Sequence, residues 1–363
     1  MLSRYIVVLA SLVLVLTISA CDALGGGKPP ANTGQEPAPQ VSQQQAVPPS
    51  QQQQVQQPQQ AQQPQQVPPT APPQPAAPWQ RGPQADKAPQ FIRAFGEKGI
   101  ELGQLSGPTS VAVDADGNLY VGDNKGLHKF DPAGNHLLSY GPDGYAGFTS
   151  AVAVAPDGTI YRSDPQADVV VMYTPDGQEI GTLGEPGSGK GQFDEPFGLT
   201  FDDQGNLYVV DRRNFRIQKF DPNGGFLMSF GSRGDKNGEF VNPRDVAVDQ
   251  QGNIYVTDQV TYLVQKFSPE GEFLLRFGQA HGDESLWLVR GVAIDDSGHI
   301  YLTDGLHARV QVFDAEGNYL LEFGLPGGDP GNLRDPDGIA IRDGKLYVAD
   351  KGNSRIQEFG LQW

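Results

Sequence analysis

The sequence predicts an all-β fold over residues 89–363, namely a six-bladed β-propeller built from four-stranded antiparallel blades. A turn glycine followed closely by an aliphatic residue and a tyrosine returns six times, at intervals of 41, 47, 47, 46 and 46 residues. Each interval holds short apolar runs separated by turn residues, and the first run of each is free of charge on both faces. Self-similarity with this period is typical of solenoids and propellers.

The N-terminal 21 residues read as an export signal. One positive charge, Arg4, precedes the apolar run 6–18, which is shorter than the roughly 20 residues of a membrane span and suits a signal-peptide core. The run ends in Ser19-Ala20-Cys21, which resembles the lipobox of bacterial lipoproteins. The resemblance implies a diacylated Cys21, anchored to the cell membrane on its extracytoplasmic side. A plain signal peptide or an uncleaved anchor stays open as an alternative.

Residues 22–88 form the next predicted region, rich in proline, glutamine and alanine. Such a segment buries too little apolar surface to offset the entropy of ordering it, so we expect a disordered linker. It would hold the folded domain away from the membrane. A docking tract for a proline-binding partner is the alternative.

The third repeat, residues 191–231, shows the expected blade most clearly. Its apolar runs predict strands at 198–202, 206–210, 215–220 and 225–230. Glycine and asparagine supply the positive φ that two-residue hairpin turns require. One four-stranded sheet cannot bury both faces alone, whereas six sheets arranged radially bury them against one another.

The inner strands and the two ends of the domain support the same arrangement. Inner strands such as Val246-Ala247-Val248 alternate large and small residues, as expected where blades converge on an axis. The last repeat stops soon after Phe359, without a full fourth strand. Residues 90–96 resemble the fourth strands of other repeats. We therefore predict that this N-terminal strand closes the last blade.

The repeats resemble NHL repeats. The third carries the matching segments Gly-Asn-Leu-Tyr-Val-Val-Asp at 205–211 and Asn-Phe-Arg-Ile-Gln-Lys-Phe-Asp at 214–221. The fourth and sixth repeats also match closely. The second departs most, since its third strand lacks the arginine, and the fifth loses the proline and glycine before its inner strand. The resemblance covers nearly all of 89–363 and implies a six-bladed propeller.

Every second strand ends in aspartate, and in three repeats an arginine follows five residues later. We interpret these residues as structural pairs that cap a turn, because a turn device is needed in every blade whereas a catalytic residue is needed once. A ring of acids for metal binding or acid–base catalysis is the alternative. The three pairs are Asp211–Arg216, Asp304–Arg309 and Asp350–Arg355.

Function is expected where the repeats differ. The residues at the entrance of the six inner strands are Thr109, Ser150, Phe197, Arg244, Arg290 and Asp337. The turns between second and third strands lie on the same face and add Lys125, Arg212, Arg213, His307 and Lys351. Because arginine presents a planar fork suited to carboxylate or phosphate, we hypothesise an anion-binding face. The alternative is ion pairing of Arg244 with Asp245 and of Arg290 with Asp337.

Composition argues against several classes of function. A net charge of −17 disfavours nucleic acid as a partner, and a single cysteine excludes an intrachain disulfide. The five histidines fall on turns or outer strands, which disfavours a zinc site. We expect no cofactor, although a channel calcium ion held by Asp337 and Asp245 stays open. The aromatic residues Tyr145, Phe148 and Trp287 are candidates for a partner contact or for local packing.

These inferences favour a monomeric, membrane-anchored, extracytoplasmic binding or scaffold module. Its expected partner is a protein, a peptide or an envelope glycan that is engaged at the channel mouth, and an anionic partner is one option. The alternative is a propeller hydrolase or lyase with a channel-bound metal ion, and binding is favoured over catalysis.

Overall fold

The computed structural model describes residues 80–141, 144, 146–278 and 285–363. Cys21, the linker up to residue 79, Tyr145 and His281 lie outside this part of the chain. The described residues are largely β-structure, with short 3-10 turns at η1 (Ala85–Lys87) and η3 (Lys351–Asn353). None of the helical segments described is long and apolar enough to cross a membrane.

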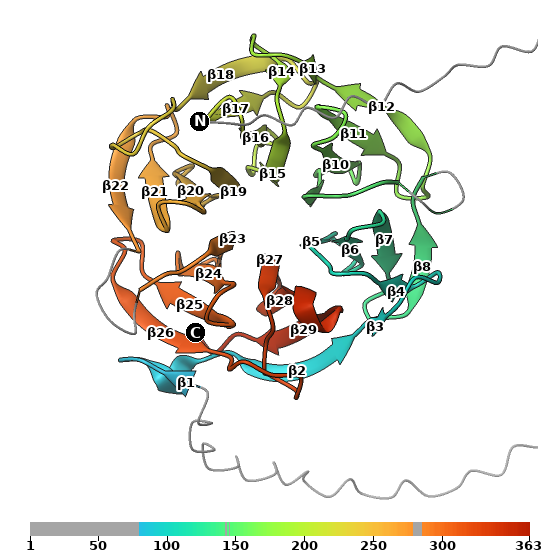
Figure 1. Cartoon of the computed structure of the whole chain (residues 1–363), viewed down its shortest axis with the longest axis vertical. Coiled ribbons are helices and arrows are strands. Elements are labelled where there is room, and N and C mark those ends of the chain that lie inside the picture. Colours follow the sequence, from blue (N-terminus) through green and yellow to red (C-terminus); the bar gives the residue numbers. More distant parts are fainter. Residues whose placement is uncertain (1–79, 142–143, 145, 279–284) are drawn as a thin grey trace, which may run out of the picture. The chain divides into compact units, whose positions relative to one another are not determined.

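Six of the sheets that the described strands form are arranged around a central channel, which confirms the predicted six-bladed propeller (Figure 1). Within each blade the strands run antiparallel from the channel outward. Blades 1 to 3 are β5 (Ser110–Val113), β6 (Leu119–Gly122), β7 (Leu127–Phe130) and β8 (His136–Ser139); β9 (Val152–Val154), β10 (Ile160–Asp164), β11 (Val169–Tyr173) and β12 (Glu179–Leu183); and β15 (Pro196–Phe201), β16 (Leu207–Asp211), β17 (Arg216–Phe220) and β18 (Phe226–Phe230).

The remaining three blades complete the ring. Their strands are β19 (Pro243–Val248), β20 (Ile254–Asp258), β21 (Leu263–Phe267) and β22 (Phe273–Phe277); β23 (Val289–Ile294), β24 (Ile300–Asp304), β25 (Arg309–Phe313) and β26 (Tyr319–Phe323); and β27 (Pro336–Arg342), β28 (Lys345–Asp350), β29 (Arg355–Gly360) and β2 (Gln90–Phe95).

The hairpin between the first two strands of a blade has three loop residues, as the predicted strands 198–202 and 206–210 of the third repeat imply. In blade 3 the Asp202 N–H donates to the Asn206 carbonyl at 3.0 Å, which closes a three-residue loop with the positive φ, 79°, on Gly205. Asn206 instead donates its side-chain amide to Asp202, and Tyr208 donates its hydroxyl to the same carboxylate. The hairpin is therefore held by one buried acid. The same arrangement recurs at Asp114 and Asp249, and at Asp295 His299 takes the place of the asparagine.

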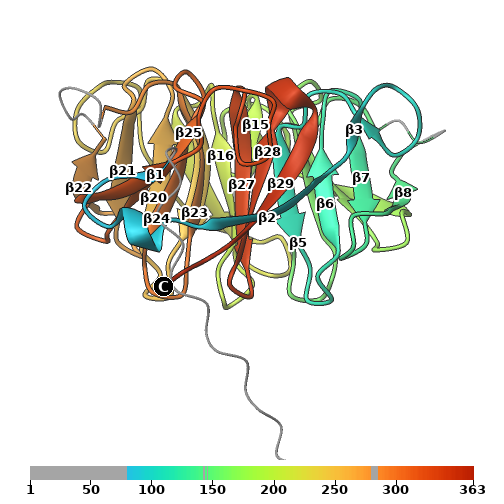
Figure 2. The same cartoon turned by 90° about the horizontal axis from the view of Figure 1, so that it is seen from below.

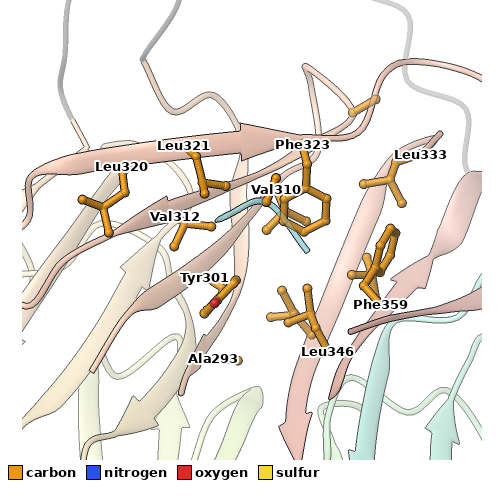
Figure 3. Close-up of a cluster of buried hydrophobic side chains, with 14 residues drawn as sticks. Ala293, Tyr301, Val310, Val312, Leu320, Leu321, Phe323, Leu333, Leu346 and Phe359 are labelled. Carbon is orange, nitrogen blue, oxygen red and sulfur yellow. The ribbon is translucent and has the colours of Figure 1, made fainter. Parts of the chain in front are cut away.

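The hydrophobic core is divided into six clusters, one between each pair of neighbouring blades. Figure 3 shows the cluster between blades 5 and 6, where Tyr301 and Val312 face Leu346 and Phe359, with the small Ala293 nearest the axis. A fully buried Leu, Val or Phe stabilises the fold by about 1.5–3 kcal/mol. The core therefore joins blades to one another, as the uncharged inner strands predict.

The predicted closure of the last blade is confirmed. Strand β2 pairs antiparallel with β29, and Figure 1 shows it as the outermost strand of blade 6. Phe91 packs edge-on against Phe359 across this pair. The Arg93 Nε donates to the buried Glu358 carboxylate at 2.6 Å, and the same guanidinium donates to the Pro132 carbonyl of blade 1. The N-terminal strand thus joins the first and last blades.

Residues 80–88, which the sequence places in the linker, extend blade 5. Strand β1 (Gln80–Arg81) pairs with β26 as a fifth strand, and η1 follows it. Leu320 on β26 is 9% exposed, whereas the equivalent Leu274 of blade 4 is 48% exposed. Sequence patterns do not reveal this strand because backbone pairing at a sheet edge needs no apolar side chains.

Four of the loops between blades share a parallel bridge. They contain β3 (Glu97–Lys98) with β4 (Gln104–Leu105), β13 (Glu185–Pro186) with β14 (Gln192–Phe193), and the bridges Arg233–Phe240 and Pro326–Leu333.

The side view in Figure 2 shows the two faces of the ring: η3, a turn between second and third strands, lies on one face and the C-terminus lies on the opposite face. We call the face that carries these turns and the entrances of the inner strands the mouth face.

Candidate functional site

The six inner strands enclose a cavity of about 290 Å³ along the propeller axis. The entrance of each inner strand contributes one residue to its lining, as expected from the repeat positions. We call this ring the channel mouth; its members are Thr109, Ser150, Phe197, Arg244, Arg290 and Asp337.

Three cationic side chains at the channel mouth contact the carboxylate of Asp337. Its Oδ1 accepts from Arg244 Nη2 at 2.6 Å, and its Oδ2 lies 3.1 Å from Lys351 Nζ and 3.5 Å from Arg290 Nη1. Burial alone favours the neutral acid, but the charges of Arg244, Lys351 and Arg290 outweigh it and lower the pKa of Asp337. Asp337 is therefore ionised and shared by three cations from blades 4, 5 and 6.

The proposed pairing of Arg244 with Asp245 does not form, and Arg244 reaches across to blade 6 instead. Successive residues of an extended strand project in different directions, so the Asp245 side chain points elsewhere. Its Oδ2 accepts from the Val292 N–H of blade 5 at 3.0 Å. Burial raises the pKa of Asp245 to about 7, and the charge of Asp337 adds to the effect. The channel thus contains a carboxyl that titrates near neutral pH.

The other proposed pair, Arg290 with Asp337, forms at 3.5 Å, and it is the longer of two ion pairs that Arg290 makes. Arg290 Nη2 lies 2.7 Å from Asp335, a carboxylate that sequence reasoning did not find. Asp335 lies two residues before the mouth residue of its blade, where blade 3 has Glu195. Glu195 likewise pairs with mouth-face arginines, at 3.4 Å from Arg212. The recurrence of an acid at this position is the signal that could have revealed it.

Two guanidinium groups lie over the Phe197 ring. The Cζ atoms of Arg212 and Arg244 lie 4.9 and 4.7 Å from the centroid of its ring. Each such contact contributes about 0.5–2 kcal/mol, depending on how far the cation is desolvated. Arg212 is fixed further by a 2.7 Å hydrogen bond from its Nε to Asn242. The ring therefore holds two like charges side by side at the channel mouth.

Positive charge exceeds negative charge among the ion pairs that Glu195, Asp335 and Asp337 make around the channel mouth. In the part of the chain that the structure describes, these pairs link five cations with three carboxylates. Arg290 is buried, and its Nε has no hydrogen-bond partner there. The cations are Arg212, Arg213, Arg244, Arg290 and Lys351, and the carboxylates are Glu195, Asp335 and Asp337.

Three of the cationic candidates lie away from the channel. Arg213 is largely exposed and lies 3.3 Å from Glu195. Lys125 donates to the Ile100 carbonyl, and His307 Nδ1 lies 2.8 Å from Asp304. The sequence therefore identified the mouth cluster but could not separate side chains that enter it from those that face solvent.

The three Asp–Arg pairs are present and serve the same position in their blades. Arg216 Nε lies 2.7 Å from Asp211, with 3.3 Å for Asp304–Arg309 and 2.7 Å for Asp350–Arg355. Asp211 also accepts the backbone N–H of Asp194, in the loop between blades. Burial raises the pKa of the Asp211 carboxyl. Asp211 and Asp350 thus tie their turns to the neighbouring interblade loops.

The residues that line the channel do not suit a cation. Its carboxylates are Asp245 and Asp337, and both lie beside arginines. Asp337 already carries three cationic partners, so an added metal ion would compete with them for one carboxylate. Within the described ranges no group of three or more His, Cys, Asp or Glu side chains is placed to hold a metal ion.

Comparison with solved structures shows the same fold. A streptogramin B lyase is 14% identical and aligns over 75% of this chain and 98% of its own, with a TM-score of 0.53. A gluconolactonase from Xanthomonas campestris is 16% identical over 79% and 99%, with a TM-score of 0.56. A Bacteroides thetaiotaomicron protein of unknown function is 15% identical over 76% and 72%, with a TM-score of 0.58. At these identities the likeness concerns the propeller fold alone.

Family models give a more specific result. The model of the strictosidine synthase-like N-terminal region matches residues 98–127. No curated protein matches the chain. The model described as the SMP-30/gluconolactonase/LRE-like region matches residues 148–362, more than half of the chain. The protein therefore belongs to the SMP-30/gluconolactonase/LRE-like family of β-propellers.

Proposed function

We propose that the protein is a binding module whose channel mouth takes a carboxylate of an anionic ligand. The observation that carries the proposal is the sharing of one ionised Asp337 by Arg244, Arg290 and Lys351. Each guanidinium presents five N–H donors, and Arg244 donates to Asp337 through Nη2. A carboxylate entering the channel would complete hydrogen bonds that the internal acids leave unfilled.

The site is also preorganised for such a ligand. Phe197 holds the Arg212 and Arg244 guanidinium groups by cation–π contacts, so little side-chain entropy remains to be lost on binding. Charge-assisted hydrogen bonds contribute about 1.5–3 kcal/mol each. The cavity of about 290 Å³ suits a single acidic side chain, chain terminus or sugar acid rather than a large ligand.

We further propose that this module is an NHL-type lipoprotein, anchored through Cys21 on the extracytoplasmic side of the cell membrane. The apolar run 6–18 and the single cysteine behind it support export and lipidation. Residues 22–79 would serve as the tether. Closure of the ring by β2 leaves only short sheet edges, which favours a monomer.

A calorimetric comparison of matched acids and neutral analogues tests the binding proposal. The probes are acetyl-Gly-Glu-amide against acetyl-Gly-Gln-amide, and galacturonate against galactose. We expect at least one acid to bind about tenfold tighter than its neutral partner, which corresponds to about 1.4 kcal/mol. Arg244→Gln and Arg290→Gln should remove this preference, whereas Arg276→Gln on outer strand β22 should keep it. Equal binding of acids and neutral analogues would refute the proposal.

A second candidate function is hydrolysis or lysis of a small substrate in the channel. It is favoured by Asp245, which titrates near pH 7 inside the channel and could transfer a proton to a bound substrate. The family name and the gluconolactonase and lyase structures point the same way. The arginine-rich mouth favours a reaction that does not route through a metal ion.

A lactone-hydrolysis assay with simple sugar lactones tests this second candidate. Activity should fall at least about a hundredfold in Asp245→Asn, since removing a general acid or base costs about 10²–10⁴ in rate. Hydrolysis that persists in that variant, or that is absent from the wild-type protein, would exclude Asp245 from such a role.

A further inference from the structure

Four exposed apolar side chains gather on the mouth face at blades 4 and 5. Val260, Tyr262, Trp287 and Leu306 are 51%, 37%, 45% and 61% exposed. The Tyr262 and Trp287 rings stack with centroids 5.5 Å apart, and the Leu306 N–H donates to the Trp287 carbonyl at 3.5 Å. We call these four residues the apolar platform. Blades 4 and 5 are neighbours in the ring (Figure 1).

The fold itself does not require apolar residues at these positions. Tyr262 ends its turn with φ of 60°, and the equivalent residues of blades 2, 5 and 6 are Asp168, Ala308 and Ser354, with φ of 58°, 55° and 54°, while blade 3 has Phe215 with φ of 56°. A bulky residue is strained in this conformation, so the backbone geometry of the turn does not favour an aromatic residue at this position. The position of Leu306 is likewise occupied by the exposed Arg213 in blade 3. The mouth face thus has a cationic side and an apolar side.

The apolar platform is continuous with the cationic mouth. The Gly305 N–H donates to the Leu288 carbonyl at 3.2 Å, which fixes the turn bearing Leu306 beside the entrance of β23. A side chain added at Gly305 would come within 3.2 Å of the Arg290 guanidinium. One ligand can therefore touch Leu306 and Trp287 while its charge lies at Arg290.

We propose that the platform and the channel mouth form one face for an acidic peptide segment, with a large apolar side chain on the platform and a nearby carboxylate at Arg290. This inference rests on the proposed function, because it assigns the ligand of the same mouth. Charge complementarity selects the acid, and the exposed rings select the apolar neighbour. Trp and Tyr supply large contact area at low entropic cost, which is typical of interface anchors.

A peptide fits this face better than a glycan. The platform also includes the exposed aliphatic side chains of Val260 and Leu306. Aliphatic side chains match the apolar side chain of a peptide rather than the hydroxyl-rich rim of a sugar. Among the described residues, five other exposed aliphatic side chains lie on the outer strands of their blades, away from the cationic mouth; Leu227 and Leu274 are two of them. They provide matched controls for non-specific apolar contact.

The test uses the full-length protein and an immobilised hexapeptide library in a Gly/Ser background. Each member carries one Phe and one Glu, in every order and spacing, and matched libraries replace Phe by Ser or Glu by Gln. We expect some Phe/Glu members to bind about tenfold tighter than both controls. Trp287→Ala and Leu306→Ala should remove the preference for Phe and keep the preference for Glu. Leu227→Ala and Leu274→Ala should remove neither.

Each remaining outcome decides against at least one proposal. Preference for Glu without preference for Phe would overturn the peptide inference and leave the anion-binding function standing. Preference for neither would overturn both. Tighter binding of trigalacturonate than of any library member, lost in Trp287→Ala, would assign the face to an acidic glycan and overturn the peptide inference. Thermal melts of Leu306→Ala, whose side chain is mostly exposed, exclude misfolding as the cause.

Discussion

Replacing Asp245 by Asn should stabilise the protein at pH 8. The amide has the shape of the carboxylate, and its oxygen can still accept the Val292 N–H. In the wild-type protein at this pH the carboxylate is ionised inside the channel, at a cost set by its pKa of about 7 against an ordinary 3.8. A tenfold change in an ionisation constant corresponds to about 1.4 kcal/mol. Converting the whole pKa difference into free energy of unfolding would give about 4 kcal/mol. Water in the channel screens the charge, which reduces the expected gain in stability to about 2 kcal/mol.

The pH window follows from the direction of the pKa change. The native state holds the Asp245 proton more tightly than the unfolded chain, so no penalty exists below the unfolded pKa of 3.8. The penalty grows as the pH rises from about 4 to about 7 and is constant above that. The stability difference between Asp245→Asn and wild type should therefore increase over this range. At pH 8 it should raise the melting temperature by about 4–8 °C, given about 2–4 °C per kcal/mol for a domain of this size.

The assay is calorimetric or circular-dichroism melting of both proteins at several pH values between 4.5 and 8. Asp337→Asn provides the contrasting variant, because that carboxylate has a lowered pKa and three cationic partners. It should destabilise the protein at pH 8. An Asp245→Asn protein that is less stable than wild type at pH 8, or a difference that does not change with pH, would refute the reasoning.

Three further predictions concern the closure and the two N-terminal regions. Arg93→Ala should cost about 3 kcal/mol in denaturant unfolding, because it removes both the hydrogen bond to buried Glu358 and the bond to Pro132 that joins blade 6 to blade 1. Lys345→Ala removes only the more exposed partner of Glu358 and should cost under about 1 kcal/mol; equal costs would contradict the closure account. Removal of residues 80–88 should lower the melting temperature by uncovering β26, and an unchanged melt would show that β1 contributes nothing. Cys21→Ser should shift the protein from the membrane fraction to the soluble fraction in cell fractionation, and unchanged retention would contradict lipid anchoring.

The fold could be predicted from sequence because each blade repeats the same devices. In blade 3 the first hairpin carries Asp202 and Tyr208, and the buried Asp211 ends the second strand. An aspartate ends the second strand of all six repeats, so the sequence contains this pattern six times. The closing strand was visible because β2 repeats the apolar pattern of other outer strands. Strand β1 was not visible, since its pairing with β26 uses backbone groups that leave no trace in side-chain pattern.

The site could be predicted only in part. Repeat positions located the channel mouth, because every inner strand enters the channel at the same point of its blade. They could not give the partners, since Arg244 pairs across the channel with a residue two blades away. The stacking of Tyr262 on Trp287 joins a turn of blade 4 with the next interblade loop, and no local spacing encodes that contact.

The most direct test of anion binding at the mouth is a crystal structure of the protein with the tightest-binding acid from the calorimetric comparison. We predict electron density for its carboxylate inside the channel, with oxygens within hydrogen-bond distance of Arg244 and Arg290. Density for the acid elsewhere, with both arginines bound only to Asp335 and Asp337, would contradict the account.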